Sequence, residues 1–327
     1  MQANEEEKVD GIIVYYPVFH KNPTHDKYVQ ETVDLTKDVE GLRHKHLHNM
    51  YHNTRFLDAP ENKKKSILPC TPLAVVKILE HLQIYNPILA SGNRLFGKTI
   101  TVINRSEVNG RPLAALLAND GATVYSVDIT GVQLFTRGQG IKKPRHQVED
   151  KEGWGLEQCL PLSDVIIGGV PVESFKVPTE LIRDGAVCIN FSSFKNFDGP
   201  AIKEKASIYV PSVGKVTIAI LLRNLVVSQA QTSFNLQPLA TDSILTLVFH
   251  VASHRQQTLQ RLSRQEPHSS QVRCFCQRLS RILATRDTIR LPKNNKKIKG
   301  KRRKSTSSGG GHKSIWLVSA HINLDIS

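Results

Sequence analysis

The chain has 327 residues, enough for about two domains with a sizeable buried core. Its formal net charge is +15, but most of the excess lies at one end, where residues 231–327 contain 17 Lys and Arg residues against 4 Asp and Glu residues. The remainder is nearly neutral, which argues against a protein that binds nucleic acid over its whole surface.

The chain starts with an acidic, polar segment, Met1–Asp10, that lacks the basic start and apolar stretch of a secretory signal. Gly11–Val14 is an apolar, β-branched run closed by Pro17, and it predicts a buried strand. A polar, histidine-rich stretch follows from residue 20 to residue 58, and no regular element is predicted in it.

A helix is predicted after Ile67–Pro72. Thr71 is placed to cap this helix, and Pro72 would occupy its first position. The apolar residues that follow recur at helical spacing and form one face: Leu73, Val76, Ile78, Leu79 and Leu82.

The clearest unit in the chain is a strand, a turn, a helix and a second strand within about thirty residues. Thr99–Ile103 is a β-branched strand, and a turn over 104–112 contains Gly110. A helix continues over Leu113–Leu117, and a second strand covers Thr123–Val127, closed by Asp128. This arrangement is typical of half of a nucleotide-binding domain.

Further strands are predicted at Val165–Ile167, Ala186–Ile189 and Ile208–Val210, followed by an apolar helix over Thr217–Val227. Because strands alternate with helices, the fold class is α/β with a parallel sheet. After Ala230 the composition becomes polar and basic without sustained periodicity, which favours disorder.

The location of the protein is predicted from what the sequence lacks. No apolar run approaches the ~20 residues of a membrane span, so we expect no membrane partner. The five cysteines, at positions 70, 159, 188, 274 and 276, show no disulfide framework, and reduced thiols in an intracellular protein are the simpler account.

The turn before the central helix is a candidate dinucleotide site. Backbone N–H groups at a helix start bind pyrophosphate, and Gly110 would allow its close approach. The turn has one glycine where the common fingerprint has three. Asp128 would accept hydrogen bonds from the ribose hydroxyls and repel a 2′-phosphate, which indicates NAD as cofactor. The alternative is an ordinary strand–helix–strand unit with a surface aspartate.

Five sequence motifs occur in the order and at the spacing that one known family shows. They are Gly11–Pro17, Asp38–Gly41, Pro69–Pro72, Val102–Pro112 and Gly214–Ala219. Over about residues 10–228 the chain resembles the methylenetetrahydrofolate dehydrogenases, and most closely the monofunctional, NAD-dependent fungal branch.

The resemblance implies a domain organisation and a setting. It implies a partial folate-binding domain over 1–85, a Rossmann-like NAD domain over 86–212, a helix over 213–230 that returns to the catalytic domain, and a disordered tail over 231–327. It also implies a homodimer that serves one-carbon metabolism and purine biosynthesis, in the cytoplasm with the nucleus as a second location. The family's Tyr-x-x-x-Lys segment would lie upstream of Met1.

The resemblance also assigns residues to the site. Tyr15, Glu40, Pro69 and Cys70 would bind the folate, with Glu40 hydrogen-bonded to the pterin's donor-rich edge. Tyr15 stands where the bifunctional enzymes have a glutamine, so we expect no cyclohydrolase activity. The cofactor residues would be Arg105, Ser106, Gly110, Asp128, Ile129, Phe191, Ser192 and Ser193.

The implied reaction is oxidation of 5,10-methylenetetrahydrofolate to the methenyl form with hydride transfer to NAD. No proton leaves in this step, so positioning is the main requirement. Cys70 is the candidate nucleophile, although a lone cysteine before a helix more often packs as a small apolar residue. Two alternatives are an inactive nucleotide-binding fragment and a nucleic-acid binder acting through its tail.

No metal is expected. Histidines 44, 46, 48 and 52 suit a solvated loop or strand, and no carboxylate pattern completes a ligand set. Cys274 and Cys276 lack a second Cys/His pair at zinc-finger spacing. Lys293–Arg303 is typical of a nuclear-localisation or nucleic-acid-binding patch, but in a Ser/Gly-rich tail we favour solvated disorder and expect nucleic acid not to be a partner.

Overall fold

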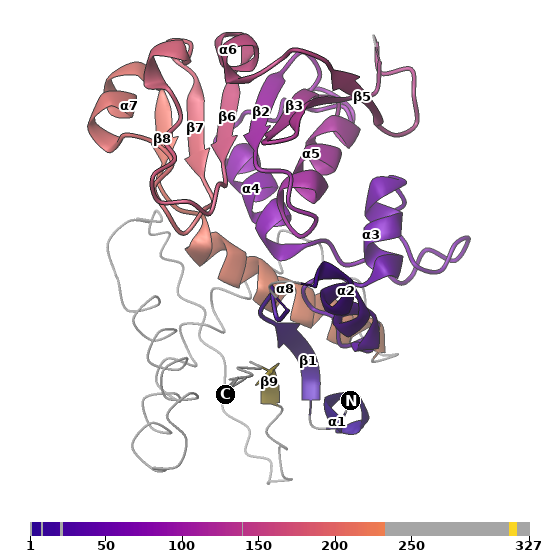
Figure 1. Ribbon diagram of the computed structural model, residues 1–327. Helices are drawn as coiled ribbons and strands as arrows, with labels where there is room; N and C mark the ends of the chain where they lie inside the picture. Colours follow the sequence, from indigo (N-terminus) through magenta and orange to yellow (C-terminus); the bar gives the residue numbers. More distant parts are fainter. Residues whose placement is uncertain (1, 8, 20–21, 139, 233–313, 319–327) are drawn as a thin grey trace, which may run out of the picture. The chain divides into compact units, whose positions relative to one another are not determined.

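The computed structural model describes residues 2–7, 9–19, 22–138, 140–232 and 314–318. Most of the described strands form one seven-stranded sheet in the order β5-β4-β3-β2-β6-β7-β8 (Figure 1). The parallel strands are β2 (Thr99–Ile103), β3 (Thr123–Asp128), β6 (Val165–Gly168), β7 (Val187–Asn190) and β8 (Ile208–Val210). The antiparallel strands β4 (Gly131–Thr136) and β5 (Gln147–Lys151) extend the β3 edge.

The order of the strands reverses at β2. The chain passes from β2 to β3 on one side, and later places β6 on the other side of β2. In open α/β sheets, ligands bind in the crevice at the carboxyl ends of the strands at such a point. The topology therefore identifies the edge that holds the ends of β2, β3, β6 and β7 as the candidate site.

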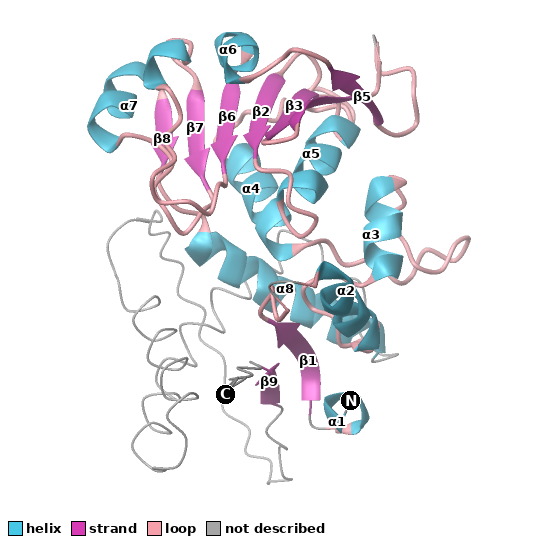
Figure 2. Cartoon of the chain, in the orientation of Figure 1, coloured by secondary structure: helices cyan, strands magenta, loops and turns pink. Residues whose placement is uncertain are grey.

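Both faces of the sheet are covered, which explains why the central strands are apolar almost throughout. On one face Ile100 and Val102 pack with helices α4 (Cys70–His81) and α5 (Gly110–Asn119), which lie behind the strands in Figure 2. On the other face Ile166 packs with the 3₁₀ turn η1 (Leu160–Leu162) and with α7 (Gly199–Lys205). Two short elements, α6 (Leu156–Cys159) and η2 (Thr179–Leu181), precede β6 and β7.

The remaining elements come from the start of the chain and from its last long helix. They are α1 (Gln2–Glu5), β1 (Val9–Val14), α2 (Pro23–Thr32), α3 (His44–Tyr51) and α8 (Gly214–Thr232). Helix α8 packs on α4 and on β1. A Cβ on Gly11 would lie 2.9 Å from Leu225 Cδ1, so the missing side chain lets α8 approach the strand closely. β1 also pairs with β9 (Ser314–Val318) in a two-stranded sheet.

The predicted strands are confirmed to within one residue at each end of the five parallel strands, and the α/β class is confirmed with them. Several helix predictions were wrong in their bounds. Helix α4 begins at Cys70 with Pro69 as its cap residue and no side-chain cap, so Thr71 does not cap it. Helix α5 begins at Gly110, before the predicted Leu113, and α8 extends beyond the predicted 217–227 at both ends.

Two predicted irregular segments contain regular structure. The stretch 20–58 forms α2 and α3, whose polar sequences gave no apolar period strong enough to predict them. Of the predicted disordered tail, residues 231 and 232 belong to α8, and 314–318 form β9; the rest lies outside the described residues. The predicted domain boundaries at 85 and 212 fall in loops, between α4 and β2 and between β8 and α8.

Candidate active site

The turn between β2 and α5 depends on the absence of a side chain at Gly110. A Cβ there would lie 1.8 Å from the carbonyl oxygen of Asn104 and 2.6 Å from its carbon. Both atoms are backbone, so no side-chain movement could make room. Gly110 is also the first residue of α5, and the turn brings the start of the helix against the end of β2. This is the close approach that a pyrophosphate-binding turn requires.

Hydrogen bonds within the turn orient its N–H groups. Asn104, which adopts a φ of 114°, donates to the carbonyl of Gly169 at 2.5 Å and accepts the N–H of Ser106 at 2.6 Å. The hydroxyl oxygen of Ser106 accepts the N–H groups of Asn109 and Gly110, both at 3.3 Å. Ser106 therefore shapes the turn. Asn104 was missed by the sequence analysis, although an asparagine directly after a strand is a signal for a left-handed residue.

The carboxylate of Asp128 lies at the end of β3 and is bonded to the turn. It accepts the backbone N–H of Arg105 at 2.6 Å and that of Ile129 at 2.7 Å. The Ile129 side chain is fully exposed beside it. One negative charge is thus fixed at the place where a Rossmann-like domain receives the adenosine ribose.

The guanidinium of Arg105 points into the β3–β4 hairpin. It donates to the carbonyls of Ser126 and Gly131 at 2.9 and 2.6 Å, and to the hydroxyl of Thr130 at 3.3 Å. Its role in this structure is to fasten the hairpin to the turn, so its hydrogen-bonding groups are engaged away from Asp128.

Phe191–Ser193 follow β7 at the same edge of the sheet. A Cβ on Gly169 would lie 1.8 Å from Phe191 Cζ, so the ring covers the bare backbone at the end of β6. The hydroxyl of Ser192 donates to the carbonyl of Val170 at 2.8 Å, and Ser193 is exposed. Asn190, which was not predicted, holds this loop through bonds to the carbonyls of Ser192, Phe194 and Pro211.

The loop that carries Glu40 is built on a buried carboxylate. Asp38, 4% exposed, accepts the N–H groups of Glu40, Gly41 and Arg43 at 3.1, 2.9 and 2.8 Å. Gly41 has a φ of 70°, and a Cβ on it would lie 2.8 Å from the backbone of Leu68. Asp38 therefore fixes the turn and leaves the adjacent Glu40 for the site.

Glu40 is held beside the end of β1. Its Oε2 accepts the N–H of Val14 at 3.1 Å, and Tyr15, 56% exposed, follows directly in the chain. Burial, with a further contribution from Asp38, raises the pKa of Glu40 to about 8. Because that value lies near neutrality, the side chain can both donate and accept hydrogen bonds.

Cys70 is buried at the start of α4. Its thiol donates to the carbonyl of Val39 at 3.4 Å and receives a bond from Asn224 Nδ2 at 3.5 Å. Burial raises the pKa of this thiol well above its usual value. A thiolate is therefore disfavoured, which supports packing as the role of Cys70. Its part in catalysis stays a prediction. Pro69 precedes Cys70 as the cap residue of the helix.

Comparisons with known proteins agree with this geometry. Residues 69–138 match the family "Tetrahydrofolate dehydrogenase/cyclohydrolase, NAD(P)-binding domain". A methylenetetrahydrofolate dehydrogenase [NAD(+)] from Schizosaccharomyces pombe is 63% identical over 226 residues, which is 69% of each chain. The enzyme of the same name from Saccharomyces cerevisiae is 59% identical over 228 residues, 69% of this chain and 70% of that protein.

The chain belongs to the methylenetetrahydrofolate dehydrogenase family. A solved structure of the NAD-dependent enzyme from Saccharomyces cerevisiae aligns with a TM-score of 0.67 and 57% identity, and the alignment covers 72% of this chain and 74% of that one. The family resemblance inferred from the five sequence motifs is therefore confirmed, and so is the Rossmann-like sheet.

The structure of this dehydrogenase brings the predicted cofactor residues to one edge. Because β2, β3 and β7 are parallel, the residues that follow them leave the sheet on the same side (Figure 1). Asp128 is the last residue of β3, and Gly110 begins α5; the others that follow the strands are Arg105, Ser106, Ile129, Phe191, Ser192 and Ser193. The substrate-side residues form a second group in which Glu40 and Cys70 are joined through Val39. The roles of both groups stay predictions.

The histidine-rich segment of the dehydrogenase is a helix, contrary to the predicted loop or strand. His44 and His48 lie on one exposed face of α3, and the ring of the cap residue His52 stacks on that of His48. His46 is buried, and its Nδ1 accepts the N–H of Ile67 at 3.2 Å. Within the part of the chain that the structure describes, no three His, Cys, Asp or Glu side chains are grouped to hold a metal ion.

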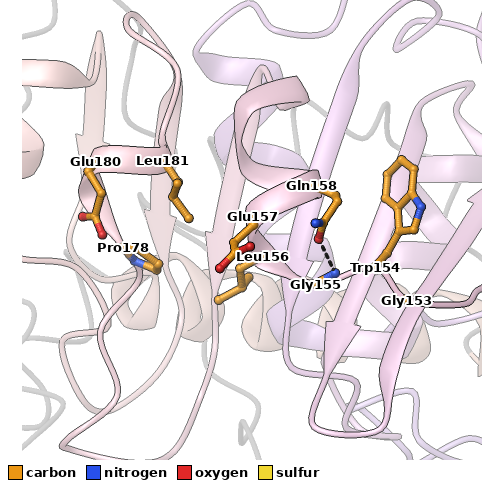
Figure 3. Close-up of a pocket in the computed structure, with 9 residues that line it drawn as sticks. All are labelled: Gly153, Trp154, Gly155, Leu156, Glu157, Gln158, Pro178, Glu180 and Leu181. Carbon is orange, nitrogen blue, oxygen red and sulfur yellow. Dashed lines mark hydrogen bonds between the residues drawn. The ribbon is translucent and has the colours of Figure 1, made fainter.

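One cavity of about 610 Å³ lies away from the predicted site (Figure 3). It is lined by Gly153–Gln158 and by Pro178, Glu180 and Leu181. These residues precede β6 and β7, so the cavity lies at the amino ends of the parallel strands. No predicted site residue contributes to it.

The helices in the described ranges include none that is long and apolar enough to cross a membrane.

Proposed function

We propose that this chain oxidises 5,10-methylenetetrahydrofolate to 5,10-methenyltetrahydrofolate, with NAD⁺ as hydride acceptor. The observation that carries the proposal is the 63% identity over 226 residues to a methylenetetrahydrofolate dehydrogenase [NAD(+)]. Two features of the site support it: the turn at Gly110 that a Cβ would fill, and the carboxylate of Asp128 at the end of β3.

The residues present fit a bound NAD. The N–H groups at the start of α5 would face the pyrophosphate, and Asp128 would accept hydrogen bonds from the ribose hydroxyls. Phe191 and Ser193, at the end of β7, would line the nicotinamide side. When bound, NAD⁺ supplies the acceptor for the hydride of the substrate's methylene carbon.

The work of the protein in this reaction is positioning. As the methylene C–H bond breaks, a nitrogen lone pair of the folate forms the C=N bond of the methenyl product, and no proton is released. No general base is required, so the protonated thiol of Cys70 is no obstacle to activity. Holding the reacting carbons close and aligned supplies most of the rate enhancement.

Glu40 is proposed to hydrogen-bond the pterin, and the proposal is restricted to the dehydrogenase step. Tyr15 lies beside Glu40 at the end of β1, in the place where an amide would act in cyclohydrolase chemistry, and its phenol cannot reproduce an amide's paired donor and acceptor. A homodimer in the cytoplasm or nucleus that supplies purine biosynthesis completes the proposal, on the strength of the family resemblance.

The direct test is NADH formation by the full chain. Purified protein with 5,10-methylenetetrahydrofolate and NAD⁺ should produce NADH, with absorbance at 340 nm as the readout, and NADP⁺ should give a far slower reaction. Protein that binds NAD in a titration but never turns over would favour the alternative, an inactive nucleotide-binding fragment. Omission of the folate is the control for other oxidations.

Glu40→Gln should change how stability depends on pH. The pKa of Glu40 is raised from 4.5 in the unfolded chain to about 8 in the folded one, so its contribution to stability is present below about pH 4.5 and is lost as pH rises toward 8. Glutamine does not titrate. The Tm of the variant minus the Tm of wild type should therefore rise from pH 5 to pH 8, because only wild type loses stability over this range, and should then level off.

The control for this pH dependence is Glu61→Gln, which changes an exposed glutamate. Thermal unfolding of the three proteins at several pH values provides the measurement. A Tm difference for Glu40→Gln that stays constant across this range would show that Glu40 has an ordinary pKa.

A further inference from the structure

Asn224 of α8 is fully buried and joins two loops that are distant in sequence. Its Nδ2 donates to the carbonyl of Val39 at 3.0 Å, 185 residues away, and to the carbonyl of Leu68 at 3.0 Å, 156 residues away. The same nitrogen lies 3.5 Å from the sulfur of Cys70. One amide thus contacts the residues next to Glu40 and next to Pro69.

The orientation of this amide is set by its neighbour in the helix. Arg223 Nη1 donates to Asn224 Oδ1 at 3.2 Å, which identifies that atom as the oxygen and directs the NH₂ group toward the two carbonyls. The thiol of Cys70 also donates to the carbonyl of Val39 at 3.4 Å. Asn224, Cys70 and the Val39 carbonyl therefore form one buried hydrogen-bonded unit.

Helix α8 also connects this unit to the cofactor edge. The loop between β8 and α8 is held by Asn190, whose Nδ2 donates to the carbonyl of Pro211 at 3.3 Å. Asn190 ends β7, directly before Phe191 on the proposed nicotinamide side. The helix that carries Asn224 thus begins at the cofactor residues and reaches the loops of the folate residues.

We propose that Asn224 is a positioning residue, which holds the Glu40 loop and the Pro69–Cys70 segment in the arrangement that presents the folate to the cofactor. This inference rests on the proposed function and deepens it. Asn224 does not touch the reacting atoms; it acts through the backbone of Val39 and Leu68. Without its donors, the carbonyl of Leu68 loses its bond to the helix and the carbonyl of Val39 keeps only the bond from the Cys70 thiol, so the two loops are free to move.

The test compares Asn224→Leu with Gln229→Leu. Gln229 lies in the same helix and also donates to a backbone carbonyl, that of Asp10 at 3.0 Å, away from both loops. We expect Asn224→Leu to lower kcat/KM for the folate by about 30-fold or more, with the Kd for NAD within about twofold of wild type. Gln229→Leu should lower kcat/KM by less than about threefold.

A second variant, Asn224→Asp, preserves the side-chain shape and should fold if leucine does not. The introduced carboxyl can donate a hydrogen bond only while protonated, and once ionised it repels the two carbonyl oxygens, so its kcat/KM at pH 9 should lie well below that of wild type. Wild-type kcat/KM in Asn224→Asp at pH 9, or equal losses in kcat/KM for Asn224→Leu and Gln229→Leu, would overturn the proposal.

Hydrogen exchange separates this inference from the proposed function. In the full chain with NAD, Asn224→Leu should exchange faster than wild type in segments 38–43 and 67–70, whereas Gln229→Leu should not. This readout requires no turnover. If the wild-type chain is inactive but the exchange pattern holds, the proposed function fails and the positioning contacts stand; unchanged exchange overturns the inference.

Discussion

Gly110→Ala is expected to abolish NAD binding and to destabilise the fold. The new Cβ would lie 1.8 Å from the carbonyl oxygen of Asn104, so the end of β2 and the start of α5 must separate. Overpacking against backbone costs about 3 kcal/mol or more. For a domain of this size that corresponds to a fall in Tm of about 6–12 °C. Calorimetry and NAD titration are the measurements.

Gly199→Ala is the matched control for this variant. Gly199 is likewise the first residue of a helix, α7, and no atom lies within 4 Å of the position of its Cβ. Alanine there should leave both Tm and NAD affinity nearly unchanged. Wild-type NAD affinity in Gly110→Ala would contradict the assignment of the cofactor turn, because the displaced helix start could not receive the pyrophosphate.

NAD is expected to bind at least about 100-fold more tightly than NADP, because the 2′-phosphate would face the carboxylate of Asp128. Like charges about 4 Å apart repel by up to about 4 kcal/mol near a protein surface, and about 2.7 kcal/mol corresponds to a 100-fold difference. Asp128→Asn removes the charge and keeps an oxygen to accept the N–H of Arg105. The ratio of the affinity for NAD to that for NADP should therefore fall by about tenfold. Fluorescence titration with both cofactors gives the ratio.

The control for this prediction is Asp184→Asn, which removes an exposed charge from the loop before β7, at the opposite edge of the sheet. The ratio of its affinity for NAD to its affinity for NADP should equal that of wild type. Equal affinity of the wild-type chain for the two cofactors, or an unchanged ratio in Asp128→Asn, would show that this carboxylate does not select NAD.

The parallel strands could be predicted because burial on both faces makes them continuous β-branched runs. Val165–Gly168 and Val187–Asn190 are buried throughout, and among the elements that the structure describes no other of that length has such a composition. β5 could not be predicted, because Gln147–Lys151 is polar and largely exposed and pairs only at the sheet edge. Helices α2 and α3 are similarly polar, and their packing on the rest of the chain decides their structure.

The candidate site divides in the same way. Gly110 and Asp128 were predicted because a turn after a strand and an acid at the next strand's end follow from local sequence. The contacts that orient Gly110 and Asp128 could not be predicted from local sequence. Arg105 was expected to face the cofactor, whereas its guanidinium bonds Ser126 and Gly131 of the hairpin. Asn224 gave no local signal, because its partners lie more than 150 residues away in the chain.

The bonds from Asn224 to Val39 and Leu68 set an order of assembly during synthesis. Translation proceeds from the first residue, and domains generally fold as they emerge from the ribosome. The segments that contain Val39 and Leu68 emerge early, yet their carbonyls receive the bonds from Asn224 only when α8 has been made. We therefore expect the sheet from β2 to β8 to fold first and the folate side to close last, so a nascent chain stalled when residue 213 has just left the ribosome should resist proteases only in its cofactor half.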